Sequence, residues 1–393
     1  MRGPGNRRLN MKLRFWRIWG IICIFYSLTC SNILNDGKCE VLQANYQAAI
    51  LMEPVTKQIL FEKDAHKHWP PASLAKMMLI LIIIEKVDAG EIKLTDLVNV
   101  SADASRIGGS QVYLKQGEVF SLEEMMKAVA IVSANDACHA VAEHVSGSVE
   151  GFVEMMNERA KELQMTDTHY YNVHGLPPSQ GQGEDMTSAY DCAILACELL
   201  KHPKVLEWTS TKQTTFRNGK LILNNTNALL KSFRGANGLK TGSYSSARFN
   251  MVVTAEREGT RFISVVLGAP TSKIRFAEAG QLLSNGFNIY PKKVLLKKGE
   301  VASQEVNIIA GKVKKIKPVA ASDLIVFVKR SEADRITVQF NGVSEMKAPI
   351  PKGASFGSIA AKLGDKTLYS VDAVANEDIQ KADFWWKLFH WDW

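Results

Sequence analysis

Cysteine is scarce in this sequence, with 6 among 393 residues. Two of the six, Cys23 and Cys30, lie in the basic and apolar N-terminal segment described below. The other four are Cys39, Cys138, Cys192 and Cys197. Four dispersed cysteines do not form a disulfide framework, and the lack of any Cys-x-x-Cys or His/Cys cluster speaks against zinc. We therefore expect no metal and no other cofactor.

Glycine and proline are modest in number and scattered, at 27 and 12 residues, so no low-complexity linker dominates the chain. Hydrophobic residues make up 46% and charged residues 22%. These are the proportions of an ordinary globular protein, and they exclude a wholly disordered chain, a collagen and a polytopic membrane protein. The length favours two domains.

No acidic residue precedes Asp36, whereas six basic residues lie in the first 17 positions. They are Arg2, Arg7, Arg8, Lys12, Arg14 and Arg17. The net charge of +8 (48 − 40) therefore falls to +2 (8 − 6) without this segment. Because no basic stripe remains in the body of the chain, we expect no nucleic-acid partner.

The N-terminus has the parts of a secretory signal peptide. An apolar run from Ile18 to Leu28 follows the basic residues, and small or polar residues follow from Thr29 to Asn32. About 11 apolar residues are too few for a comfortable membrane span, which needs roughly 20. Residues 1–30 are thus interpreted as a signal peptide, with an uncleaved membrane anchor as the alternative. Export implies an oxidising compartment.

The C-terminus is rich in tryptophan, with four of the eight tryptophans in the last nine residues. In a helix, Phe384, Leu388 and Trp391 would share one face. About 11 residues give roughly 16 Å of helix, which can lie on a bilayer but cannot cross it. We expect residues 376–393 to form an amphipathic helix on a membrane surface. A tail packed on its own domain is the alternative.

Between the two ends, residues 39–290 mix helical and strand patterns, whereas residues 291–375 show short β-rich runs. Strands are expected over Ala48–Pro54 and Gln58–Phe61, as a hairpin, and over Asn250–Ala255 and Phe262–Leu267. Helices are expected over Ser73–Ala89, Ser121–Val145, Val149–Leu163, Ser188–Lys201 and Ile274–Phe287. The expected fold class is α/β (α+β), followed by a small all-β domain and the C-terminal helix.

Ser73-Leu74-Ala75-Lys76 opens the first apolar helix. A serine at a helix start has an unpaired backbone N–H, and a lysine at i+3 lies one turn further on the same face. A neutral amine at that place could take the serine proton. The pattern alone has low specificity, because Ser344 and Lys347 have the same spacing in the β-rich region.

Two further motifs follow in the mixed region. Ser133-Ala134-Asn135 follows an apolar helix, and Lys240-Thr241-Gly242 precedes the strand-like runs. Alone, they would be interpreted as a helix cap and a polar strand edge. In this order and spacing, the three motifs resemble those of the penicillin-binding and serine β-lactamase-like proteins. They are most similar to the low-molecular-mass D-alanyl-D-alanine carboxypeptidases. The resemblance also covers Gly117-Glu118, Asn172–Leu176, Gly238-Leu239, the β domain and the aromatic tail.

The resemblance implies a role for each motif residue. Ser73 would be the acylated nucleophile and Lys76 its general base, with the pKa of Lys76 lowered by burial and by a second cation, Lys240. Ser133 would relay the proton to the departing amine, and Asn135 would hold the substrate amide.

The resemblance also implies how the substrate carboxylate and the oxyanion are bound. Thr241 and Arg275 would bind the terminal carboxylate, although Arg275 could instead be a surface charge on its helix. The N–H groups of Ser73 and of Ser243, just past Gly242, would form the oxyanion hole.

Two residues near the motifs keep two interpretations each. His174 lies in a loop that borders the site in the family, so it is either a structural loop histidine or a direct acid or base. Cys138 follows Asn135 by about one helical turn. It is either a small buried residue or a thiol near the cleft.

The resemblance implies removal of the C-terminal D-alanine from peptidoglycan stem peptides through an acyl-enzyme on Ser73, which β-lactams would also acylate. It implies an exported enzyme, peripheral on the outer (periplasmic) face of the bacterial cytoplasmic membrane. One alternative is a serine β-lactamase, in which Glu184 could activate the deacylating water. The others are a D,D-endopeptidase and a peptidoglycan-binding morphology protein with little turnover.

Overall fold

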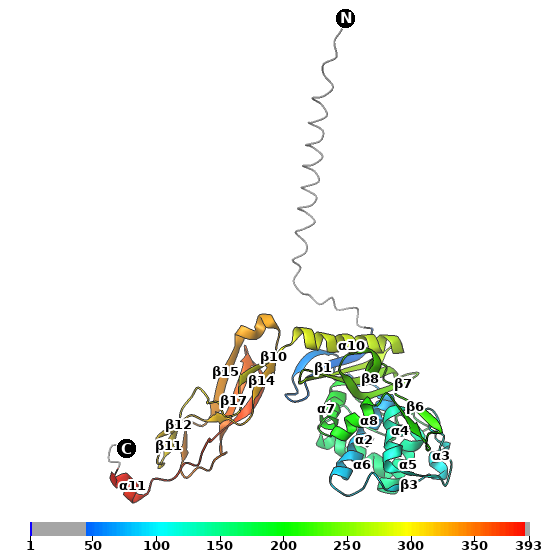
Figure 1. The fold of residues 1–393 in the computed structure, drawn as a ribbon, viewed down its shortest axis with the longest axis horizontal. Helices are drawn as coiled ribbons and strands as arrows, with labels where there is room; N and C mark the ends of the chain where they lie inside the picture. The colour runs from blue at the N-terminus through cyan, green and yellow to red at the C-terminus, as the bar shows by residue number, and fades with distance from the viewer. Residues whose placement is uncertain (2–44, 390–393) are drawn as a thin grey trace. The chain divides into compact units, whose positions relative to one another are not determined.

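The computed structural model describes Met1 and residues 45–389. The expected signal peptide (1–30), Cys39 and the end of the expected C-terminal helix (390–393) lie outside the described residues. Within them, helices and strands mix up to α10 (Ser272–Ile289), and strands dominate after it (Figure 1). This is the fold class expected from the sequence.

A five-stranded antiparallel sheet forms the centre of the first region, in the strand order β2-β1-β9-β8-β7. The strands are β1 (Ala48–Met52), β2 (Ile59–Lys63), β7 (Ala236–Tyr244), β8 (Arg248–Arg257) and β9 (Thr260–Ala269). The expected β1–β2 hairpin and the expected strands β8 and β9 are confirmed. Because β1 pairs with β9, the first and last strands of the region lie side by side.

The Lys240-Thr241-Gly242 motif precedes the expected strands β8 and β9, and it lies in a strand of its own, β7, at one edge of this sheet. Glycine and a buried lysine give this segment little strand propensity of its own. Its pairing with β8, in which Lys240 lies opposite Val252 and Gly242 opposite Asn250, makes it a strand.

Helices cover both faces of the sheet, with α10 on one side and α2, α7 and α8 on the other (Figure 1). Because both faces are covered, every residue of β9 from Phe262 to Ala269 is buried, without the alternation of a one-sided sheet. The helices before α10 are η1 (Ala72–Ala75), α2 (Lys76–Asp88), α3 (Ala102–Arg106), α4 (Leu122–Ile131), α5 (Asn135–Ser146), α6 (Val149–Glu162), α7 (Ala189–Leu199), α8 (Pro203–Ser210) and α9 (Leu229–Ser232). Two small antiparallel sheets pair β3 (Leu97–Asn99) with β4 (Val119–Ser121) and β5 (Gln213–Phe216) with β6 (Leu221–Asn224).

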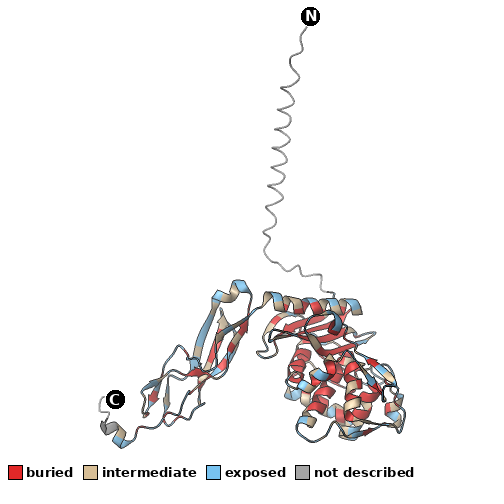
Figure 2. Cartoon of the chain, viewed as in Figure 1, coloured by how far each residue is buried: buried red, intermediate tan, exposed pale blue. Residues whose placement is uncertain are grey.

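α2 is a core helix. Every residue from Lys76 to Ile84 is buried, which matches a sequence that is apolar all round after its first residue. Buried residues extend through the surrounding helices and the sheet (Figure 2). The N-terminal end of α2 is therefore held by the packing of the whole region.

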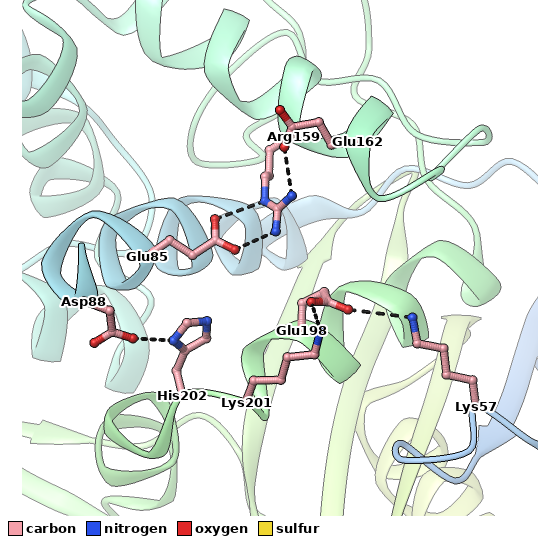
Figure 3. A network of polar contacts seen from close by, with 8 residues as sticks. All are labelled: Lys57, Glu85, Asp88, Arg159, Glu162, Glu198, Lys201 and His202. Atoms are coloured by element: carbon pink, nitrogen blue, oxygen red, sulfur yellow. Dashed lines mark hydrogen bonds and ion pairs between the residues drawn. The ribbon is translucent and has the colours of Figure 1, made fainter. Parts of the chain in front are cut away.

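Polar contacts fix the other end of α2 (Figure 3). The Arg159 guanidinium on α6 donates two hydrogen bonds, of 3.0 and 2.6 Å, to the Glu85 carboxylate. The Nδ1 atom of His202 lies 2.6 Å from an Asp88 carboxylate oxygen. These contacts tie the C-terminal end of α2 to α6 and to the start of α8.

The helix expected over Ser121–Val145 is two helices, α4 and α5. Ser133 between them has φ +65°, a left-handed conformation that interrupts an α-helix. The Asn135 N–H then donates to the Ser110 carbonyl at 2.7 Å instead of continuing the α4 ladder. The apolar periodicity runs through the break, so the sequence pattern did not reveal it.

The second region is built of short strands, as expected. They are β10 (Lys292–Leu296), β11 (Val306–Ile309), β12 (Lys315–Ile316), β13 (Val319–Ala320), β14 (Leu324–Phe327), β15 (Ile336–Gly342), β16 (Glu345–Lys347), β17 (Ser355–Leu363) and β18 (Lys366–Val374), with η2 (Arg330–Arg335) between β14 and β15. The largest sheet has the order β13-β18-β17-β15. Two hydrophobic clusters form the core of this second region, one around Leu324 and Ile359 and one around Val306 and Phe356.

The C-terminal helix is shorter than expected. α11 spans Phe384–Phe389, whereas residues 376–383 are not helical. The N–H of Ile379 and that of Ala382 donate to carbonyls of the β domain, which holds this segment extended. Within the described part of the chain, no helix combines the length and the apolar character that a membrane span requires.

Candidate active site

Ser73 and Lys76 lie at the start of the central helix. Ser73 belongs to η1 and Lys76 begins α2, so the two side chains are one turn apart. The Lys76 Nζ atom lies 3.0 Å from Ser73 Oγ, in a hydrogen bond. Ala72, directly before the serine, has φ +50°, a conformation that costs energy outside glycine. The local backbone thus brings an amine within proton-transfer distance of an alcohol.

The environment of Lys76 favours a neutral amine. Its side chain is fully buried, and burial lowers the pKa of Lys76 from its usual value to about 8. Cys138, Asp185 and Asp136 act in the opposite direction and limit the shift. A second hydrogen bond, of 2.6 Å to the His174 carbonyl, orients the amine.

Lys240 is a second buried cation. Its Nζ atom donates to the Thr241 carbonyl at 3.0 Å. Burial, Lys76 and Arg275 together lower the pKa of Lys240 well below its usual value. Burial was expected to lower the pKa of Lys76 and does so. The expected repulsion between the two buried lysines is present as well, and it contributes to the low pKa of Lys240.

Ser133 and Asn135 each present a buried polar atom with no hydrogen-bond partner among residues 45–389. These atoms are the Ser133 hydroxyl oxygen and the Asn135 side-chain oxygen, in residues that are 4% and 2% exposed. The Asn135 amide nitrogen is fixed by the Gly108 carbonyl at 2.7 Å, which sets the direction of the free oxygen. Unpartnered buried polar atoms are rare and call for an explanation, and a bound ligand is one.

The edge strand β7 lies directly against the backbone of Ser73. A Cβ atom on Gly242 would lie 2.8 Å from the Ser73 nitrogen and 3.0 Å from the Leu74 nitrogen. The Thr241 hydroxyl donates to the Thr226 hydroxyl at 2.8 Å, and Ser243 is exposed. The motif glycine therefore allows the strand to approach the N–H of Ser73 closely.

Arg275 is buried, so the alternative of a surface charge on α10 is wrong. It is 6% exposed, and its Nη1 atom lies 3.5 Å from the Gly242 carbonyl and 3.3 Å from the Asn250 carbonyl. Burial lowers the pKa of Arg275 to about 10. Its Nε atom has no partner within residues 45–389. The guanidinium thus adds a positive charge behind β7.

The geometry of His174 favours the interpretation as a loop residue. Its Nδ1 atom accepts a hydrogen bond of 3.2 Å from the Leu176 N–H. Burial and the charge of Lys76 lower the pKa of the His174 ring to about 3, so the ring is neutral at physiological pH. The group that meets Lys76 is the carbonyl of His174, not its ring.

Two supporting side chains were not singled out from the sequence. Asp136, fully buried, accepts hydrogen bonds from the N–H groups of Val112, Leu114 and Ala137. Asn250 on β8 donates to the carbonyls of Pro70 and Pro71, just before Ser73. Asp136 adjoins the second motif, which was a usable signal, whereas no local signal marks Asn250.

Of the remaining candidates, Cys138 interacts with the two buried lysines, whereas the second Ser-x-x-Lys match lies in the β domain. Cys138 is fully buried, its thiol donates to the Val173 carbonyl at 3.0 Å, and burial raises the pKa of Cys138 to about 12. A thiol of this kind is a packed side chain, in agreement with the first of its two interpretations. Ser344 and Lys347, the second Ser-x-x-Lys match, are both exposed at the surface of the β domain.

Comparisons with known proteins find D-alanyl-D-alanine carboxypeptidases. A family model described as D-alanyl-D-alanine carboxypeptidase matches residues 37–271, and the model of the penicillin-binding protein 5 C-terminal domain matches residues 290–381. The chain is 36% identical to the D-alanyl-D-alanine carboxypeptidase DacF of Bacillus subtilis, over 89% of this chain and 90% of that protein.

Solved structures show the same similarity. Penicillin-binding protein 5 from Haemophilus influenzae has a TM-score of 0.77 at 29% identity, covering 86% of this chain and 98% of that chain. Penicillin-binding protein D2 from Listeria monocytogenes, solved in an ampicillin-bound form, has a TM-score of 0.58 at 32% identity. It covers 63% of this chain and 99% of that chain.

Proposed function

The chain belongs to the D-alanyl-D-alanine carboxypeptidase family, and on that basis we propose that Ser73 is acylated when the enzyme removes the terminal D-alanine from a peptidoglycan stem peptide. The observation that carries the proposal is the 3.0 Å contact between Ser73 Oγ and Lys76 Nζ, an amine whose pKa is lowered to about 8. When the amine is neutral, the serine can donate in this contact, which is the direction that acylation requires.

In acylation, each proton transfer and the oxyanion have a group that carries the proton or the charge. Ser73 Oγ attacks the carbonyl carbon of the penultimate D-alanine while its proton passes to Lys76. The N–H groups of Ser73 and Ser243 stabilise the oxyanion. As the C–N bond breaks, the proton travels from Lys76 through the Ser133 hydroxyl to the departing D-alanine amine. Water then hydrolyses the ester, which releases the shortened peptide and restores the serine.

Recognition of the substrate uses the unpartnered and cationic groups around Ser73. The Asn135 oxygen, which has no partner within residues 45–389, accepts the N–H of the substrate amide. The Thr241 hydroxyl binds the terminal carboxylate, and the positive charges of Lys240 and Arg275 favour that anion. A site that requires a free carboxylate removes one terminal residue, which defines a carboxypeptidase.

The test is an assay of D-alanine release from an acyl-D-alanyl-D-alanine tripeptide by the purified chain without residues 1–30. We expect release by the native sequence and none by Ser73→Ala, because only the hydroxyl oxygen can form the ester. Mass spectrometry should place a penicillin adduct on Ser73. Undiminished release by Ser73→Ala would overturn the assignment of the nucleophile.

The same assay separates the alternative functions. A stable adduct without D-alanine release would favour the endopeptidase or the morphology protein. Rapid turnover of the adduct would favour the β-lactamase. In the structure, a carboxylate oxygen of Glu184 accepts a hydrogen bond of 2.9 Å from the Tyr244 hydroxyl, at the end of β7. In a β-lactamase, the Glu184 carboxylate would have to activate the water that hydrolyses the acyl-enzyme. Here the carboxylate already binds the Tyr244 hydroxyl.

For the cellular location, we propose export by residues 1–30 and attachment to the outer face of the cytoplasmic membrane through residues 376–393. The peptidase domain would comprise residues 39–290 and the β domain residues 291–375. Phe384 and Trp385, which are 72% and 66% exposed, support the attachment, because large exposed aromatic side chains partition into the headgroup region.

Replacing both Phe384 and Trp385 by serine is expected to reduce sedimentation with phosphatidylcholine vesicles at least about tenfold, given roughly 1.5–3 kcal/mol for each large apolar side chain buried. D-alanine release from a soluble peptide should not change. The matched control replaces Val338 and Val343, exposed valines of the β domain, by serine. Equal vesicle binding by both double variants would contradict the attachment through the tail.

A further inference from the structure

A buried carboxylate that the proposed reaction does not use lies beside the site. Asp185 is 4% exposed and precedes two backbone bridges, Met186 with His169 and Thr187 with Trp69. Both bridges are made by N–H to carbonyl hydrogen bonds of 2.8 to 3.0 Å in each direction. The backbone at Asp185 is therefore held in place from its C-terminal side.

The Asp185 carboxylate binds the start of the loop over residues 171–176. Its Oδ1 atom accepts hydrogen bonds from the N–H groups of Tyr171, at 2.6 Å, and Asn172, at 3.2 Å. Its Oδ2 atom is buried and has no hydrogen-bond partner among residues 45–389. One carboxylate oxygen thus organises the loop, while the other is buried without a partner among residues 45–389.

The loop transmits this contact to the catalytic lysine. The Asn172 side-chain oxygen accepts hydrogen bonds from the N–H groups of His174, at 3.2 Å, and Gly175, at 2.6 Å. The carbonyl of His174 then accepts the 2.6 Å hydrogen bond from Lys76 Nζ. A continuous series of hydrogen bonds therefore leads from Asp185 through the loop to the amine beside Ser73.

Asp185 also acts on Lys76 through its charge. The two groups interact electrostatically in both directions: Asp185 raises the pKa of Lys76, and Lys76 lowers that of Asp185. Burial, the larger effect, raises the pKa of Asp185 to about 7. The other titratable groups that interact with this pair are Asp136, Cys138, His174, Glu184, Lys240, Tyr170 and Tyr244.

We propose that Asp185 is a positioning residue for acylation, which holds the loop so that the His174 carbonyl aims the Lys76 amine at Ser73. Its negative charge also stabilises the ammonium that Lys76 becomes on taking the serine proton. The inference rests on the proposed function, because it assigns Asp185 to the reaction of that same site. Asp185 itself does not touch the reacting atoms.

Two substitutions separate the two contributions. Asp185→Asn keeps an oxygen that can accept the N–H groups of Tyr171 and Asn172 but removes the charge. Asp185→Ala removes both and leaves these N–H groups without their acceptor. Glu184→Gln is the matched control, since it removes a carboxylate from the neighbouring position, where the side chain binds Tyr244 and not the loop.

The experiment measures the rate of acylation by a fluorescent penicillin at pH values on both sides of 8, with thermal unfolding of each variant. The acylation rate is expected to fall at low pH, where Lys76 becomes protonated. For Asp185→Asn, we expect this fall to occur at lower pH than in the native protein, because loss of the negative charge lowers the pKa of Lys76. Its maximal rate should also fall, because a weaker base and an unbalanced ammonium both slow proton transfer. For Asp185→Ala, we expect a fall of roughly 10- to 100-fold at all pH values, which corresponds to one lost charge-assisted contact.

In Glu184→Gln, the acylation rate should fall at the same pH as in the native protein. A pH profile of Asp185→Asn that coincides with the native profile would overturn the electrostatic role. If the acylation rate fell equally in both Asp185 variants, in proportion to their loss of thermal stability, Asp185 would have only a structural role. Normal acylation followed by a stalled ester would also overturn the inference, since Asp185 would then act on water. If the native protein itself forms no adduct on Ser73, the proposed function fails first.

Discussion

Replacing Lys76 by alanine is expected to lower the rate of Ser73 acylation by about 10²- to 10⁴-fold, the range typical of a lost general base. The Lys76 amine contacts Ser73 Oγ at 3.0 Å, and its side chain is fully buried, so bulk water cannot easily take its place. No other amine or imidazole is hydrogen-bonded to Ser73 among the described residues.

The substitution should leave the fold in place, because the apolar residues of α2 that pack in the core are unchanged. Thermal unfolding checks this, and the fluorescent penicillin adduct measures acylation. The matched control is Lys347→Ala, which removes the exposed lysine of the second Ser-x-x-Lys pattern and should have no effect on either quantity. An unchanged acylation rate in Lys76→Ala would remove Lys76 as the base.

Replacing Gly175 by alanine is expected to be the most damaging of the glycine substitutions near the site. Gly175 has φ +71°, and a Cβ atom there would lie 1.9 Å from the Ala72 carbonyl oxygen. The obstacle is backbone, so no side-chain rotation can relieve it. The loop and the segment before Ser73 must move apart, and the His174 carbonyl then loses its position on Lys76.

We expect Gly175→Ala to lower the free energy of unfolding by about 2–5 kcal/mol, the sum of left-handed strain and overpacking. The rate of acylation should fall at least about tenfold, since a displaced base costs a factor of this order or more. Gly181→Ala is the control, because Gly181 has φ +81° but nothing within 4 Å of the added atom. Gly181→Ala should lower the free energy of unfolding by only about 1–2 kcal/mol, the cost of left-handed strain without overpacking. Equal effects of the two substitutions would show that the close packing against Ala72 is unimportant.

The local chemistry of the nucleophile follows from the sequence alone. Ser73 and Lys76 meet because residues three apart share a helix face, and helical periodicity is a local property of the chain. The β1–β2 hairpin and the strands β8 and β9 were likewise predicted from short runs of residues. The order and spacing of the three motifs were enough to indicate the family.

Strand pairing and backbone conformation decided other elements. β7 is a strand because β8 pairs with it, although its own residues favour no strand. The left-handed Ser133 divides one apolar pattern into two helices. Hydrogen bonds from the β domain keep residues 376–383 extended, so α11 begins later than the aromatic pattern suggested.

Which charges are buried depends on the tertiary structure, and this sets the chemistry of the site. Lys76 and Lys240 lose water only when helices and sheet close around them, and the lost hydration lowers the pKa of each amine. The sequence left Arg275 open to interpretation as a surface charge, and its burial behind β7 excludes this. Asp185 carries no motif at all, because its effect depends on a loop that other parts of the chain bring against Lys76. A sequence shows which groups can ionise, but the free energy of removing them from water is a property of the folded protein.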